Sequence, residues 1–329
     1  MKTAAIIRIV IGSLIALTLT AVLSMKLTGK THALAWARRA DGWEELFEDD
    51  DDDADNAEKS AESMHTFAGN GSVPAADVRE MEIEWVAGEV RVAPGSGAEV
   101  TFTETCGRQL NDNQTMRYSL QNGKLIISYC AKTQQVWDWL DLDRLDMPEK
   151  DLTVTVPEAM MAQLQKLEIN GVSAGITVSG LTAQKMDVET VSGGAVFSEL
   201  HAQELDVETV SGEIRVEKSE VDSMEFDGTS GSLAFSGAAQ KMDASTVSGD
   251  ITLAFSNAQP TKVETSVTSG DVTVTLPQDS SFRVRLETVS GELECEFPSV
   301  MQDKYSVVGD GTGEYRFESV SGDVRIRKG

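Results

Sequence analysis

Residues that could carry out chemistry are few in this sequence and do not converge on one another. Gly171 to Gly175 (GVSAG) matches the G-x-S-x-G string of a hydrolase nucleophile elbow. That motif needs a strand, a sharp turn and then a helix, whereas Ser173 is followed by ITVSG, the pattern of another strand. Of the three histidines only His201 lies in the β-rich part of the chain, so no His-based triad or zinc cluster is predicted there.

Acidic side chains recur at one position of a repeated unit: Glu213, Asp250, Asp271, Glu292 and Asp323. A carboxylate in successive units is typical of a solvated edge, not of a tuned acid and base pair. Stacked like charges cost energy, which a bound cation or a basic partner would relieve, but the Gly-Gly-x-Gly-x-Asp repeat of calcium-binding coils is absent. The sequence therefore predicts a protein that is not an enzyme and that holds no cofactor and no metal.

Two further groups of residues are candidates for contacts or for a cross-link. Trp137 and Trp139 stand close together in a polar segment, which is typical either of a glycan or protein contact or of tryptophans packed under a loop. Cys106 and Cys130 each end a predicted strand and could form a disulfide in an oxidising compartment. Cys295 occupies an apolar column of the repeat and is predicted to be a buried small hydrophobe.

The element that must position these residues is a repeat running from residue 166 to 329. Its units are anchored on Ala174 and then on glycines that each directly follow a serine: Gly193, Gly212, Gly231, Gly249, Gly270, Gly291 and Gly322. The residues two and four past each anchor, such as Leu233 and Phe235, are apolar, whereas those between them are mostly polar, which indicates a strand. Before the anchor the phase of the alternation changes, so each unit is two short strands around a corner. We expect an all-β fold, a parallel β-solenoid of about eight such coils.

Four segments precede the repeat. Residues 1–8 are a short tail, and residues 9–25 are 17 residues without a charge, predicted to be a transmembrane helix or an uncleaved signal. Residues 26–79 hold a juxtamembrane helix and an acidic linker with the run EDDDDD. Residues 80–165 alternate with period two, as in EMEIEWVAGEVRV, and form a smaller β segment.

The charge balance limits the partners. With 28 basic and 54 acidic residues the formal net charge is −26, which argues against binding to nucleic acid. More basic residues follow the apolar segment than precede it, and by the positive-inside rule alone this would place the body in the cytoplasm.

The TVSGEI and SVSGDV units, the LTVTVPE segment before them and the apolar N-terminal segment together resemble a bacterial family of proposed adhesins with repeated β-strand domains, a domain of unknown function that includes LiaG-like envelope proteins. The resemblance covers residues 80 to 329. It implies a membrane-anchored cell-envelope protein, its body extracytoplasmic, with an adhesive or scaffolding role. The partner would be an unidentified envelope protein, a glycan or a second copy. The alternatives are a cell-wall glycan-binding module and a cytoplasm-facing scaffold.

Overall fold

The computed structural model describes residues 67–131 and 147–329. Strands dominate this part of the chain, with one short 3₁₀ turn, η3 (Ala75–Asp77), and one short helix, α4 (Glu158–Met161). No helix among the described residues is long and apolar enough to cross a membrane. The predicted anchor at residues 9–25, the juxtamembrane helix, most of the acidic linker and the two tryptophans, Trp137 and Trp139, lie outside the described residues.

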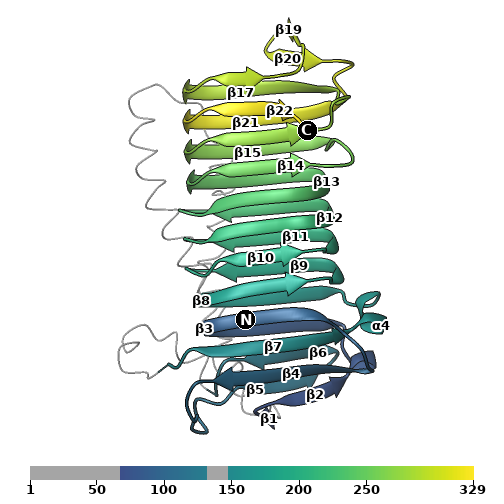
Figure 1. The fold of residues 1–329 in the computed structure, drawn as a ribbon, viewed down its shortest axis with the longest axis vertical. Helices are drawn as coiled ribbons and strands as arrows, with labels where there is room; N and C mark the ends of the chain where they lie inside the picture. Colours follow the sequence, from purple (N-terminus) through teal and green to yellow (C-terminus); the bar gives the residue numbers. More distant parts are fainter. Residues whose placement is uncertain (1–66, 132–146) are drawn as a thin grey trace, which may run out of the picture.

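The strands stack as parallel coils into an elongated body (Figure 1). Each coil gives one strand to a first face, turns at its anchor residue, and gives one strand to a second face. The first face follows the order β6 (Lys124–Ser128), β3 (Glu80–Gly95), β8 (Lys166–Ser179), β9 (Thr182–Thr190), β11 (His201–Thr209), β12 (Glu213–Gly228), β13 (Ser232–Ser248), β15 (Lys262–Ser269), β21 (Gly313–Ser321) and β17 (Phe282–Ser290).

The second face follows the same layers. Its order is β7 (Lys150–Pro157), β3, β8, β10 (Ala195–Ser198), β12, β13, β14 (Ile251–Phe255), β16 (Val272–Leu276), β22 (Val324–Lys328) and β18 (Leu293–Cys295). The long strands β3, β8, β12 and β13 bend at a corner and belong to both faces. The stack does not break at the boundary predicted between residues 165 and 166, because β3 pairs in register with β8.

The core lies between the two faces and contains the predicted apolar columns. Side chains two and four past the anchors, for example Leu233 and Phe235, are buried in seven of the eight units. The exception is the unit of Leu293 and Cys295, which are only half-buried. Cys295 was predicted to be a buried small hydrophobe, but it is only half-buried, because β18 belongs to the last layer of the stack and pairs only with β22 among the described strands.

The corners explain why the anchor residue is glycine. At Gly193, Gly212, Gly231, Gly249, Gly270, Gly291 and Gly322 an added Cβ would lie less than 3.0 Å from the backbone carbonyl oxygen of the anchor on a neighbouring coil. Threonines three residues before an anchor support the corners. The N–H of Gly193 donates to Thr190 Oγ1 at 3.1 Å within one corner, and Thr246 Oγ1 donates to the carbonyl of Gly231 on the neighbouring coil at 3.0 Å. The glycine of the T-V-S-G string is thus a requirement of close stacking between backbones.

Substitution of Gly249 by alanine tests this account. Gly249 does not have a positive φ, so alanine meets steric conflict without backbone strain: its methyl group would collide with the carbonyl of Gly231 and lie 3.2 Å from Ser232 Oγ. We expect Gly249→Ala to lower the free energy of unfolding by about 1 to 3 kcal/mol, measured by urea denaturation. Gly107→Ala is the control, since a Cβ there meets no atom within 4 Å. Equal stability of the two variants would contradict the stacking role.

The last coil enters the stack out of chain order. β21 and β22 lie between the layer of β15 and β16 and the layer of β17 and β18, so the final residues of the chain are not the end of the stack. The connection is the hairpin of β19 (Val300–Gln302) and β20 (Tyr305–Val308), which lies above β17 (Figure 1). This hairpin accounts for the long interval between Gly291 and Gly322 in the repeat.

Antiparallel strands cover the opposite end. β4 (Glu99–Cys106) pairs with β7, β5 (Arg117–Gln121) pairs with β6, and β2 (Gly71–Pro74) and β1 (Phe67–Ala68) pair with β4 and β5. The outer edges of β7 and β6 therefore pair with strands of the same chain, which is one way in which proteins prevent edge-to-edge association.

Candidate functional site

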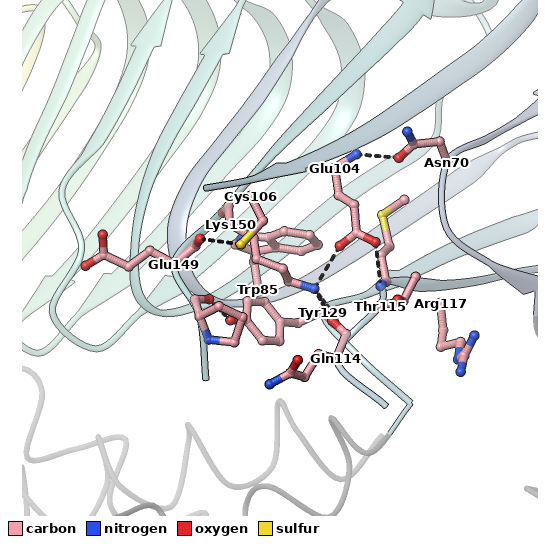
Figure 2. A network of polar contacts seen from close by, with 12 residues as sticks. Asn70, Trp85, Glu104, Cys106, Gln114, Thr115, Arg117, Tyr129, Glu149 and Lys150 are labelled. Atoms are coloured by element: carbon pink, nitrogen blue, oxygen red, sulfur yellow. Dashed lines mark hydrogen bonds and ion pairs between the residues drawn. The ribbon is translucent and has the colours of Figure 1, made fainter. Parts of the chain in front are cut away.

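A buried lysine is the centre of the most prominent polar cluster in the described residues (Figure 2). The Lys150 side chain is 0% exposed, and its Nζ lies 2.9 Å from Glu104 Oε2. Nζ also donates to the carbonyl of Gln114 at 2.7 Å and to the carbonyl of Tyr129. The rings of Trp85 and Tyr129 flank it, with their centroids 5.0 and 4.0 Å from Nζ.

The surrounding residues are held by further hydrogen bonds. Trp85 Nε1 donates to the carbonyl of Lys150 at 2.8 Å, and the Tyr129 hydroxyl donates to the carbonyl of Pro148. Glu104 Oε1 accepts from the N–H of Met116 at 2.9 Å. The cluster therefore joins β3, β4, β7 and the segments that follow β4 and β6.

This arrangement does not suit a catalytic lysine. A nucleophilic amine must be neutral and within reach of a substrate. Burial does lower the pKa of Lys150, although the hydrogen bond and the charge of Glu104 oppose this. However, the three N–H groups of the ammonium have acceptors and the side chain has no solvent exposure. The geometry is that of a structural cross-link between the cap and the stack.

The position of Lys150 in the repeat explains why it can be a lysine. By register it pairs with Gly88, which in turn pairs with Ala174, the first anchor of the predicted repeat. Lys150 is therefore the anchor-position residue of the terminal layer, next to Cys106 of the antiparallel strand β4. Among the described strands no further coil stacks on this side, so a side chain fits where the inner layers require glycine or alanine.

The two cysteines of the predicted disulfide lie around this cluster. Cys106 is half-buried, and its thiol donates to the carbonyl of Glu149 at 3.5 Å. Cys130 is buried and directly follows Tyr129. Both sulfurs are thiols in this structure, and both are near enough to contribute to the electrostatics of Lys150 and Tyr129. The Cys106 to Cys130 bond stays a prediction.

Three aspartates of the acidic column, Asp250, Asp271 and Asp323, form a hydrogen-bonded ladder on the outside of the corners. Asp250 Oδ1 accepts from the N–H of Asp271 at 2.9 Å, and Asp271 Oδ1 accepts from the N–H of Asp323 at 2.9 Å. Asp323 Oδ1 accepts from the N–H of Glu292 at 3.1 Å. The guanidinium of Arg325 and the N–H of Asp323 lower the pKa of Asp271. Backbone donors and Arg325 thus relieve the stacked charge, and no cation is needed for this.

The other sequence candidates take structural positions. Ser173 lies inside β8 and its hydroxyl donates to the carbonyl of Val86 at 3.1 Å, so no helix follows it as a nucleophile elbow would need. His201 begins β11, is exposed, and lies 3.8 Å from Glu220. The described residues contain no group of three or more His, Cys, Asp or Glu side chains that could hold a metal ion.

The end of the stack at β17 differs from the capped end. β20 pairs with Phe282, Arg283 and Val284 of β17, but from Arg285 to Ser290 the outer edge of β17 has no partner strand among the described residues. Val289 is 59% exposed, and in the nearby hairpin Val300 and Met301 are 66% and 70% exposed. Sequence analysis missed this surface, because it depends on the out-of-order last coil.

Comparison with known families identifies the stack. The family model described as "Toastrack DUF4097" matches residues 78–327, the capped and coiled body. The chain belongs to the toastrack DUF4097 family. The match includes β3 and the segment before the repeat, in agreement with the continuous sheet. The family resemblance inferred from the Ser-Gly units is therefore confirmed.

Solved structures similar to this toastrack chain include proteins from Parabacteroides, Bacteroides and Clostridium species. A proposed adhesin from Parabacteroides distasonis ATCC 8503 is 14% identical, with 80% of this chain and 98% of the other covered and a TM-score of 0.47. A proposed adhesin from Bacteroides fragilis NCTC 9343 is 11% identical, with 79% and 97% covered and a TM-score of 0.43. A proposed cell adhesion protein from Clostridium sporogenes ATCC 15579 is 11% identical, with 80% and 100% covered and a TM-score of 0.28. The comparison with curated proteins returned no match.

Proposed function

We propose that this toastrack protein is a structural and interaction protein of the cell envelope without catalytic activity. The observation that carries the proposal is that the reactive side chains of the described body serve the fold itself. Lys150 is enclosed by three acceptors, the carboxylates at the corners accept backbone N–H groups, and Ser173 bonds to the backbone. What the molecule presents to its surroundings is a long, regular surface with two different ends.

The proposed location follows from the segment before the body. Residues 9–25 would anchor the chain in the cell membrane, and the toastrack body would project on the extracytoplasmic side. Of the predicted linker at 26–79, residues 67–77 belong to the cap, so the part before residue 67 would act as the spacer. The distribution of basic residues favours the opposite orientation, and the family resemblance favours this one. Binding of cell-wall glycan through Trp137 and Trp139 stays the alternative proposal for the partner.

Protease treatment of intact cells tests the location. If the body lies outside, a protease that cannot enter cells removes it under conditions that digest a known surface protein and spare a cytoplasmic protein. We expect the stacked body to resist cleavage and the acidic segment at residues 48–58 to be cut, so the epitope that is followed should lie at the C-terminal Gly329. An intact chain in treated whole cells, with digestion after lysis, would show that the body faces the cytoplasm.

A further inference from the structure

The open end of the stack has the properties of an edge that can pair with another strand. Residues 285–290 of β17 form a continuous outer edge, and Thr288, Val289 and Ser290 are exposed. Next to this edge the apolar columns of the core are only partly covered: Leu286, Leu293 and Cys295 are half-buried. Exposed strand edges with apolar side chains are the usual templates for association by strand pairing.

The charge of this end permits two copies to meet. Residues 282–329 contain 7 basic and 9 acidic side chains, a net charge of −2 out of the −26 of the whole chain. Two copies therefore repel one another less when these ends meet than when the strongly acidic remainders of the two chains meet. At the capped end the coil edges of β7 and β6 are already paired with β4 and β5, so the coils offer no matching edge to the open end there.

We propose that two copies of this chain associate end to end through residues 286–290 of β17, in an antiparallel pair around a two-fold axis at Thr288. In this dimer the partner of the interaction protein proposed above is a second copy of the same chain. The inference rests on the proposed function only for the cellular location of the dimer.

The position of the axis follows from the geometry of the edge. The β20 hairpin blocks pairing before Arg285, and the chain leaves the edge at the Gly291 corner, so the free window is residues 285–290. Directly opposed residues of an antiparallel pair have their side chains on the same face of the sheet. Even-numbered residues of β17 must therefore oppose even-numbered residues of the other copy, and odd-numbered residues must oppose odd-numbered ones.

An axis at Thr288 satisfies both conditions. It opposes the two Thr288 side chains, a favourable cross-strand pair, and places Val289 of each copy beside Glu287 of the other. An axis at Glu287 would oppose two like charges, and an axis at Leu286 would run into the hairpin. The arrangement is isologous, as in most homodimers, and it closes after two copies.

The test compares the mass of the full chain, purified in mild detergent, with that of two lysine variants by sedimentation. Val289→Lys adds a charge to the exposed edge, and Val196→Lys adds the same charge to an exposed position in the middle of the stack. We expect the wild-type chain and Val196→Lys to sediment with a twofold monomer mass and Val289→Lys as a monomer. A wild-type monomer at all concentrations, or a dimer that persists in Val289→Lys, would overturn the proposal.

A cysteine at the axis tests the register. Thr288→Cys brings two thiols opposite one another, at a separation that a disulfide can bridge. Under mild oxidation it should give a covalent dimer on a non-reducing gel, whereas the wild-type chain, with its three native cysteines, and Ser248→Cys should not. Cross-linking to a different protein in cells would refute the second copy as occupant. Failure of dimerisation leaves the location unaffected, since protease treatment tests that separately.

Discussion

Replacing Lys150 with methionine is expected to lower the free energy of unfolding by about 3 to 5 kcal/mol, the usual cost of removing one partner of a buried ion pair. Methionine keeps most of the apolar contact with Trp85 and Tyr129. It leaves the Glu104 carboxylate, whose side chain is 8% exposed, without its cation. The carbonyls of Gln114 and Tyr129 lose a donor as well. The energy is measured from the midpoint and slope of urea unfolding.

Two further variants separate the buried pair from a general effect of the substitution. Lys241→Met makes the same change on an exposed residue of β13 and should cost no more than about 0.5 kcal/mol. Adding Glu104→Gln to Lys150→Met removes the unpaired charge, so the double variant should be more stable than Lys150→Met alone. A Lys150→Met protein as stable as Lys241→Met would show that the cluster does not join the cap to the stack.

The coils of the body were predictable because a strand alternates its side chains between two faces. A column of apolar residues two and four past a glycine can therefore be read directly from one repeat to the next. The same signal extends further than sequence analysis recognised. Gly88-Glu89-Val90-Arg91-Val92 has the spacing of Gly212-Glu213-Ile214-Arg215-Val216, and this would have placed β3 in the stack.

Other features depend on contacts between layers, which no periodicity encodes. Lys150, and not glycine, occupies the anchor position of the layer that carries the cap. The repeat is recognisable there only by the buried apolar residues two and four positions later, Leu152 and Val154. The order of the last two layers is set by the β19–β20 hairpin and not by order along the chain. The acidic column was predicted to be a solvated edge, but its hydrogen bonds to backbone N–H groups of neighbouring coils appear only when the coils are placed together.

Truncation of Phe235 to alanine tests the register of the central coils and should cost about 3 to 5 kcal/mol. Phe235 is 1% exposed, and by register it lies between Val216 and Leu253 of the adjacent layers. Its ring centroid is 5.5 Å from that of Phe255. Neighbours held in register on both sides cannot move into the space, so the loss includes a cavity as well as the buried ring.

Glu213→Ala is the matched control for Phe235→Ala, since both residues lie on the second face of adjacent coils. Glu213 points outward, its side chain is 62% exposed, and it pairs with Arg215 at 2.5 Å. Exposed ion pairs contribute little, so this variant should stay within about 0.5 kcal/mol of the wild type. Because a shift of one residue exchanges every side chain between the two faces, a near-neutral Phe235→Ala together with a costly Glu213→Ala would reverse the register of the stack.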